Sequence, residues 1–233
     1  MTPIASPVLE STDVRREAEA VFERVFRSDF SQPGFAVLVL PAGVGSHELR
    51  RSMTMLKERL SELHMERWGE PLEYLSLGRF DQQTTTRLHL DGAPERSFLM
   101  LGYEPTQVRS EFHIADFARC ASDLGITPVE FMRDHNPMFS GGTDLLRDQV
   151  TTIADWPEDR PRIVIINNSM AEPGVFGATL GVLHGATIPS PNPQASRVIN
   201  SSMMAPACFA TCDPAMHVQQ FISTDNISGQ ILS

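Results

Sequence analysis

Hydrophobic positions repeat with two different periods along the chain. In residues 12–27 and 46–67 they recur every three or four positions, which predicts two amphipathic helices, with Ser46 expected to cap the second. From residue 72 onward, short apolar or β-branched runs alternate with turn residues, which is typical of strands. The predicted strands are residues 34–40, 74–80, 84–90, 97–103, 108–114, 162–166, 181–188 and 197–203, and two short helices are predicted at 116–124 and 128–134.

These elements predict a single domain over residues 1–233. A helical N-terminal support (1–71) is expected to pack on a β core (72–205), followed by a tail (206–233) whose mixed pattern assigns no element. Several short strands separated by turns indicate a mainly β fold, either a sandwich or a barrel.

Composition narrows the classes of function. The formal net charge is -10, which argues against nucleic acid as a partner because phosphate binding requires a basic face. Three cysteines make no disulfide framework, and the chain shows neither a secretory signal nor an apolar run of membrane-spanning length. We therefore expect a soluble, cytoplasmic protein without a membrane partner, while its oligomeric state is not predicted.

The first candidate for chemistry is the pair His89 and Asp91. Residues two apart on a strand face the same side, so both side chains can bind one metal ion. The similar pair His64 and Glu66 lies in a predicted helix, where residues two apart point about 200° away from each other and cannot converge.

The best candidate for a third ligand is His184. It lies in an apolar stretch where an imidazole without a function would need a partner, and Arg197, the only cation in the last 71 residues, follows it by thirteen positions. His113, His135 and His217 remain alternatives. His113 lies at the end of a predicted strand and His135 in a helix-ending turn, so each can have a structural role instead. No arginine follows His217, so it does not fit the spacing.

Arg197 opens an apolar strand, where a charge is costly unless it is paired. Two interpretations are open: a salt bridge to an acid such as Glu172 or Asp213, or a clamp for a ligand carboxylate. The loose group Cys208, Cys212 and His217 is a weak zinc candidate because it lacks a fourth ligand.

The pattern His89-x-Asp91, a distal His184 and then Arg197 resembles that of the Fe(II)/2-oxoglutarate-dependent oxygenase superfamily. The resemblance covers roughly residues 72–205 and points to no particular member. It implies a double-stranded β-helix (jelly-roll) core, Fe(II) held by the His–Asp–His set, and 2-oxoglutarate bound through Arg197. It also implies use of O2, with succinate and CO2 as co-products. Ile199 departs from the pattern, because many members have Ser two residues after the arginine, so either another hydroxyl holds the cosubstrate or the cosubstrate is held differently.

The strand leading into the ligands suggests the kind of substrate. In a regular strand, Gln83 and Arg87 share the parity of His89 and would face the pocket, which favours an acidic or amino-acid-like small molecule. Two alternatives are open: Arg87 replaces Arg197 as the clamp for the cosubstrate, or a bulge turns Arg87 outward to meet Glu95 or Asp81. Two other functions stay open: an Fe(II) oxidase that does not use 2-oxoglutarate, and a jelly-roll binding protein without enzymatic activity.

Overall fold

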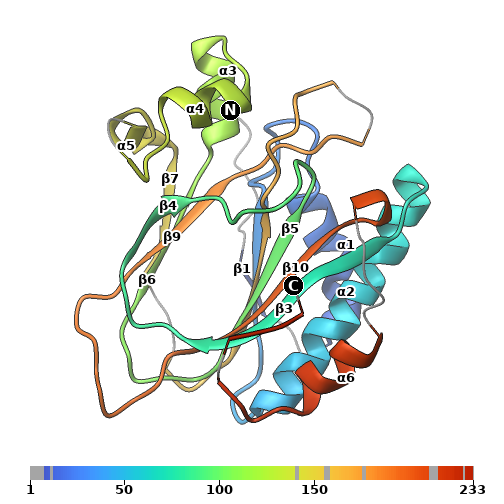
Figure 1. The fold of residues 1–233 in the computed structure, drawn as a ribbon, viewed down its shortest axis with the longest axis vertical. Coiled ribbons are helices and arrows are strands. Elements are labelled where there is room, and N and C mark those ends of the chain that lie inside the picture. Colours follow the sequence, from blue (N-terminus) through green and yellow to red (C-terminus); the bar gives the residue numbers. More distant parts are fainter. Residues whose placement is uncertain are drawn as a thin grey trace.

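The computed structural model describes residues 8–10, 13–139, 142–154, 158–174, 177–209, 215–227 and 229–232. They form two sheets that face each other, with helices on the outside of the larger one (Figure 1). The larger sheet has the order β1 (Val8–Glu10), β2 (Phe35–Val39), β8 (Arg162–Asn167), β5 (Phe98–Tyr103), β10 (Val198–Pro206), β3 (Leu72–Asp81) and β11 (Gly229–Leu232). The smaller sheet has the order β4 (Thr86–His89), β9 (Leu183–Thr187), β6 (Glu111–Ala115) and β7 (Val150–Ile153).

All strand pairs are antiparallel except β1 with β2. The prediction of a mainly β protein with supporting helices is therefore confirmed at the level of two mainly antiparallel sheets. Among the described residues, no helix is both long enough and apolar enough to cross a bilayer.

The helices form two groups. The larger sheet is covered on its outer face by α1 (Val14–Val25), α2 (Ser46–Trp68) and α6 (Ala215–Ser223) (Figure 1). The second group, α3 (Phe117–Leu124), α4 (Pro128–Asp134) and α5 (Gly142–Leu145), lies beside one end of the smaller sheet together with the short 3-10 helix Arg147–Gln149. The second 3-10 helix, Ala207–Phe209, follows β10.

The central strands of the larger sheet read as continuous apolar runs because both of their faces are buried. On β2, Ala36 and Leu38 belong to the core under the helices, whereas Phe35, Val37 and Val39 belong to the core between the sheets. The space between the sheets is the place where side chains from both can meet, and the candidate site lies there.

The larger sheet also carries a buried ionic cluster on its helix-facing side. Glu104 accepts hydrogen bonds from Arg79, Asn200 and Ser46, and Arg50 of α2 donates to Ser46 and to Asn200. Ser46 was expected to cap α2, but it is the first helical residue, and the N-cap is Gly45 without a side-chain hydrogen bond. The Ser46 hydroxyl instead joins the helix to this cluster.

The strands predicted at residues 108–114 and 181–188 begin later, at Glu111 and Leu183. The pattern did not reveal β1, β7, α6 or β11. Two of these, α6 and β11, fall in the unassigned tail, where α6 packs on α2 and β11 pairs with β3.

Candidate metal centre

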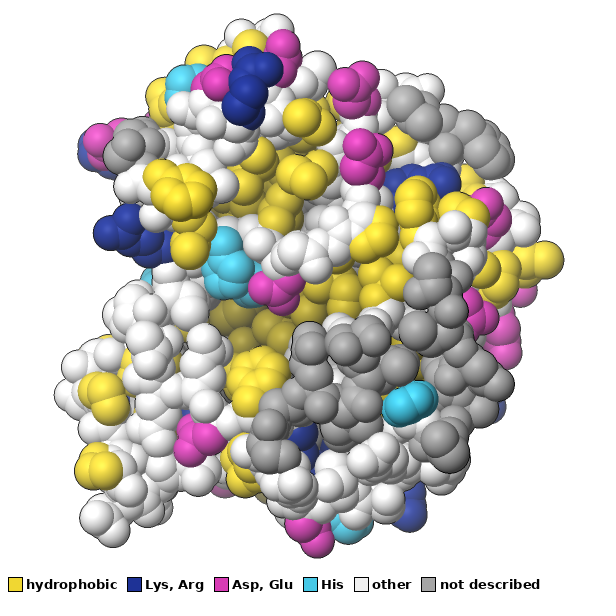
Figure 2. All heavy atoms as spheres, in the orientation of Figure 1, with side chains coloured by type: hydrophobic (Ala, Val, Ile, Leu, Met, Phe, Trp, Pro, Cys, Tyr) yellow, Lys and Arg dark blue, Asp and Glu magenta, His cyan; other side chains and the backbone are white. Residues whose placement is uncertain are grey.

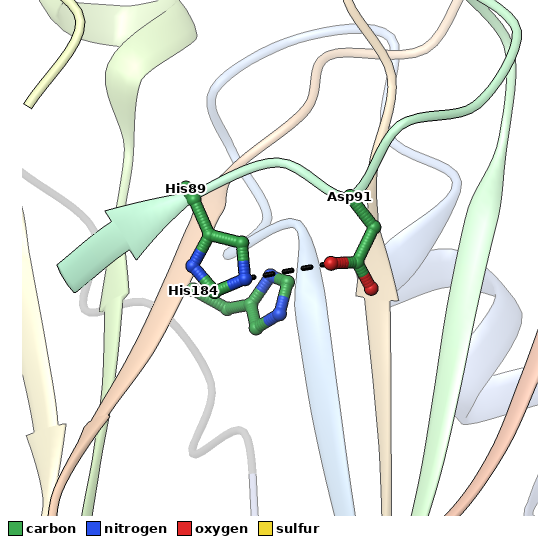
Figure 3. A group of neighbouring side chains, drawn as sticks. All are labelled: His89, Asp91 and His184. Carbon is green, nitrogen blue, oxygen red and sulfur yellow. Dashed lines mark ion pairs between the residues drawn. The ribbon is translucent and has the colours of Figure 1, made fainter. Parts of the chain in front are cut away.

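Two histidines meet across neighbouring strands of the smaller sheet. His89 ends β4 and His184 lies near the start of β9, and the two residues pair directly in the antiparallel ladder. Their ring centroids are 4.3 Å apart. Asp91 follows in the loop after β4, and its carboxylate points toward the ring of His89 (Figure 3).

A buried asparagine holds the loop that carries Asp91. The Asn168 side chain accepts a hydrogen bond from the backbone N–H of Asp91 and donates to its backbone carbonyl, both at 3.0 Å. Asn168 also donates to the Ser97 hydroxyl, and both residues are buried. From sequence, residues 167–169 read only as a turn at a strand end. The structure shows that Asn168 fixes the backbone position of a candidate ligand.

The three side chains can offer their ligand atoms to one ion. One atom from each of His89, Asp91 and His184 lies within 4.8 Å of the other two, and His89 Nε2 is 3.4 Å from Asp91 Oδ1. His89 Nδ1 lies 2.7 Å from the backbone carbonyl oxygen of Arg87 and donates to it. Such a bond fixes the tautomer and orients the other ring nitrogen, Nε2, for a metal.

The electrostatics keep His184 and Asp91 in the forms that bind metals, whereas the hydrogen bond to Asp91 raises the pKa of His89. Burial lowers the pKa of His184 to about 4, with the Asp91 charge opposing this shift, so the imidazole is neutral near pH 7. For Asp91, burial disfavours the charge, but the hydrogen bond from His89 and the neighbouring imidazoles hold its pKa below the usual value. The Nδ1 atom of His184 is buried and has no hydrogen-bond partner among the described residues. An unpartnered imidazole nitrogen at such a site calls for a further partner.

Arg197 lines the same small cavity as the three candidate ligands. The cavity has a volume of about 110 Å³, and the Arg197 side chain enters it from the residue just before β10, on the same face as Ile199 and Ser201. Arg197 is only 2% exposed. The sequence therefore identified a cation that shares a buried space with a possible metal site.

The contacts of this guanidinium leave it without a described carboxylate partner. Nη1 donates to the Gln82 carbonyl at 3.1 Å, and the group lies 5.0 Å from the ring centre of Tyr103. Nε is buried and has no partner among the described residues. Of the two acids considered as salt-bridge partners, Glu172 forms no ion pair with Arg197, and Asp213 lies outside the described residues.

Three hydroxyls that the sequence did not single out also line the cavity: Thr86, Tyr103 and Ser201. Tyr103 is buried beside Arg197, and burial raises its pKa to about 12 although the arginine opposes the shift. The signal was present in the strand pattern, because Tyr103 shares the parity of Leu99 and Leu101, which face the space between the sheets. The Tyr103 hydroxyl group thus belongs to the lining of the cavity that contains Arg197, whereas the Ile199 side chain has no hydroxyl.

Gln83 and Arg87 do not line this cavity. The pairing register of β4 with β9 shifts between Thr86 and His89, so the regular alternation assumed from sequence is interrupted there. The Arg87 side chain lies at the surface and donates to the Met138 carbonyl at 2.9 Å. Gln83 bonds instead to the backbone of Asn192 and Ala195. Their role in substrate binding stays a prediction.

The other histidines lie apart from this group. His64 is buried, with its Nδ1 2.6 Å from the Glu70 carbonyl oxygen, and His113 bonds to two threonines. His135 follows α4 as its C-cap, and His217 lies on α6. Within the described residues, His89, Asp91 and His184 are the only set of three suited to hold a metal. Cys212 lies outside the described residues, so the zinc candidate stays untested.

Comparisons with known proteins found no matching family model and no matching curated sequence. They did find distant similarity to solved structures. One is a variant of the iron and alpha-ketoglutarate-dependent endoperoxidase NvfI, 13% identical, with a TM-score of 0.40 and coverage of 83% of this chain and 84% of that chain. The same endoperoxidase in a different conformation is 12% identical, with a TM-score of 0.38 and coverage of 83% of each chain.

A third similar structure is a Burkholderia xenovorans protein provisionally named an alpha-ketoglutarate dependent 2,4-D dioxygenase. It is 12% identical, with a TM-score of 0.38, and the match covers 88% of this chain and 95% of that chain. Similarity at this level does not carry an argument about activity. Any functional conclusion for this chain therefore rests on the geometry of its own residues.

Proposed function

We propose that this protein is a non-haem Fe(II)/2-oxoglutarate-dependent oxygenase that oxidises a small molecule, built on a double-stranded β-helix core. The observation that carries the proposal is the convergence of His89, Asp91, His184 and Arg197 on one buried cavity. Two histidines and one carboxylate with open coordination positions are typical of non-haem Fe(II) oxygenases.

The donor set fits iron. Two imidazoles and one carboxylate offer nitrogen and oxygen ligands, and the bond from His89 Nδ1 to the Arg87 carbonyl orients Nε2, which would give up its proton on binding the metal. The buried Nδ1 of His184 without a partner indicates a site built for something besides protein. His89, Asp91 and His184 would hold the metal.

The environment of Arg197 fits a ligand carboxylate. A buried guanidinium without a described acid partner is a fork of donors to which a carboxylate can bind in bidentate fashion. The Tyr103 hydroxyl lies beside it and can donate to the same carboxylate. We assign the distal carboxylate of 2-oxoglutarate to this pair, with Tyr103 in place of the hydroxyl that Ile199 does not provide.

When bound, iron and 2-oxoglutarate would activate O2 to oxidise the substrate, and succinate and CO2 would be the co-products. The chain's residues orient the reactants: Arg197 and Tyr103 hold one end of the cosubstrate, while the packed walls of Phe112 and Leu101 restrict water. The strand pattern suggested an acidic or amino-acid-like substrate that binds to Arg87. Such a substrate would require the Arg87 side chain to leave the Met138 carbonyl.

The test is anaerobic titration of the purified protein with Fe(II) and 2-oxoglutarate, followed by assay of succinate in air. A weak visible charge-transfer band and succinate formation are expected. His184→Ala should abolish both, whereas His113→Ala, which changes another histidine of the smaller sheet, should abolish neither.

Two results would favour the competing functions. Substrate turnover without succinate would indicate an oxidase in which Arg197 binds the substrate's carboxylate. Absence of Fe(II) binding would leave a binding protein without this enzymatic activity.

A further inference from the structure

A second and larger cavity adjoins the candidate metal centre. Its volume is about 580 Å³, and it shares Phe80, Asp91 and Ser201 with the smaller cavity that contains Arg197. Asp91 therefore lies between a small space, which suits a compact dicarboxylate, and a space several times larger. If the proposed function holds, the larger cavity is where a substrate can approach the metal from a side that Arg197 does not line.

The sequence creates this cavity by placing small residues where the neighbouring strands carry large ones. On β3, Ser76 and Gly78 face the space between the sheets, and Gly78 pairs with Ser201 of β10. Elsewhere on this inner face of the larger sheet the strands carry residues such as Val164, Leu101 and Val37, which fill the core. Three small residues beside Asp91 thus leave unfilled space next to the candidate ligands.

The lining of the larger cavity is more apolar than polar and is almost uncharged. Its walls include Leu75, Leu99, Met203 and the loop segment 92–94, and Asp91 is the only ionisable side chain among the described residues that line it. Figure 2 shows a hollow between the two sheets whose interior is mostly hydrophobic, with a histidine and an acidic side chain next to each other at its edge.

The nearby arginines are directed elsewhere. Arg79 lies on β3 itself but on the opposite face, where it is paired with Glu104. The Arg87 guanidinium is held at the surface by the carbonyls of Met138 and Phe139. An anionic molecule in the cavity would therefore lie against the Asp91 carboxylate and would lose its hydration without gaining a cation.

We infer that the larger cavity binds the substrate and that this substrate is a neutral, predominantly apolar organic molecule. Calling this ligand a substrate rests on the proposed function, whereas the chemical class of the ligand rests on the cavity alone. The hydroxyls of Ser76 and Ser201 provide hydrogen bonds for one uncharged polar group, such as an alcohol, ketone or amide. Leu75, Leu99 and Met203 contact the hydrocarbon part.

The test compares matched neutral and anionic probes by calorimetry on the full chain with metal removed by a chelator. Two pairs serve: adamantane-1-carboxamide against adamantane-1-carboxylate, and 2-naphthamide against 2-naphthoate. We expect each amide to bind at least about tenfold more tightly than its acid. Equal or tighter binding of the acids, or binding of none of the four probes, would overturn the inference.

Two variants locate the binding. Gly78→Val places an isopropyl group in the cavity and should weaken amide binding at least about tenfold, whereas Thr151→Val, on the exposed face of β7, should leave it unchanged. Ser76→Arg introduces a cation into the same space and should reverse the preference within each pair in favour of the acid. Amide binding that survives Gly78→Val, together with an unreversed preference in Ser76→Arg, would place the probes elsewhere and refute the assignment.

This design separates the inference from the proposed function. Binding of the amides to the metal-free protein does not require iron chemistry. If the amides bind as expected but Fe(II) and 2-oxoglutarate yield no succinate, the oxygenase proposal fails and the assignment of the cavity stands. If succinate forms but the acids are preferred, the assignment fails and the oxygenase proposal stands.

Discussion

Replacing Arg197 with Met distinguishes a ligand clamp from a structural cation. In the protein without ligands, the Arg197 guanidinium is buried, contacts Tyr103 and the Gln82 carbonyl, and has no carboxylate partner among the described residues. Burying an ion costs several kcal/mol unless it is compensated, so a methionine of similar length removes that cost along with the contacts to Tyr103 and the Gln82 carbonyl. We expect the free energy of unfolding of Arg197→Met to equal that of the parent or to exceed it by up to about 1 kcal/mol.

Arg27 provides the matched control. It is equally buried, but it forms a close ion pair with Asp116 at 2.6 Å. Arg27→Met removes this ion pair and the hydrogen bonds to the Leu180 and Gln32 carbonyls, and it leaves Asp116 only the longer pair with Arg119 at 3.4 Å. Breaking a buried pair in this way typically costs about 3 kcal/mol or more. Urea unfolding should therefore separate the two arginines clearly. A loss of about 3 kcal/mol or more in Arg197→Met would show that Arg197 has a structural partner and would refute this reasoning.

Ligand binding gives the second half of the prediction. Losing a charge-assisted carboxylate pair of about 3 kcal/mol or more corresponds to a weakening on the order of 100-fold, so Arg197→Met should need that much more 2-oxoglutarate. At 100 times its dissociation constant, 2-oxoglutarate should stabilise the metal-loaded parent by about 2.7 kcal/mol. For a chain of this size that corresponds to roughly 5–10 °C in Tm, a shift that Arg197→Met should lose.

The controls for ligand binding are Arg197→Lys and Arg87→Met. Arg197→Lys should recover only part of the affinity because an ammonium cannot reproduce the guanidinium fork. Arg87→Met should leave 2-oxoglutarate affinity unchanged because that side chain lies outside the cavity. If Arg87→Met weakens 2-oxoglutarate while Arg197→Met does not, the clamp has been assigned to the wrong residue.

Four further predictions address other parts of the molecule. His184→Ala should reduce Fe(II) affinity at least about tenfold in equilibrium dialysis, and unchanged binding would remove this residue from the site. Gly185→Ala should also lower Fe(II) affinity about tenfold, because the added Cβ would lie 3.0 Å from two backbone oxygens of β4; parent-like affinity would show that β4 can move freely. Burial lowers the pKa of His64 in the folded state, so the unfolded state binds a proton at higher pH than the folded state does. The free energy of unfolding should therefore fall as the pH drops below about 6.5, by up to about 1.4 kcal/mol per pH unit. His64→Gln should flatten that dependence in urea unfolding at a series of pH values, and an unchanged slope would contradict the cause. Glu104→Gln leaves two buried arginines without their carboxylate and should cost about 3 kcal/mol; a loss under about 1 kcal/mol would mean that backbone carbonyls suffice.

Periodicity predicted the parts of the fold that bury a continuous face. The apolar positions of α2, including Leu49, Met53, Leu56 and Leu60, are buried, and the apolar runs of β2, β5 and β8 occupy the middle of the larger sheet. The strands that escaped detection lie at sheet edges. Most residues of strand β7 are exposed, so its sequence shows no clear alternation of apolar and polar residues. Strands β1 and β11 are short and lie at the two edges of the larger sheet.

The candidate site was predictable where the geometry is local and unpredictable where it depends on distant partners. His89 and Asp91 are two residues apart, and the apolar setting of His184 marked it as unusual. Nothing in the sequence shows that Asn168 holds the backbone of Asp91, since they are 77 residues apart and the asparagine reads as a turn residue. The same holds for Tyr103, whose position beside Arg197 depends on the pairing of β5 with β10.

Local irregularity explains why Arg87 and His89 diverge although they share parity in the sequence. The register shift between Thr86 and His89 interrupts the alternation of β4, which leaves Arg87 outside while His89 turns inward. The irregular strand must approach β9 closely, and it does so at Gly185, where any side chain would press on the backbone oxygens of Thr86 and Arg87. One of these oxygens, that of Arg87, accepts the hydrogen bond that orients the ring of His89. The glycine that follows His184 in sequence therefore permits the irregular course of β4, and this course places the Arg87 carbonyl where it orients His89 so that Nε2 lies 3.4 Å from the Asp91 carboxylate.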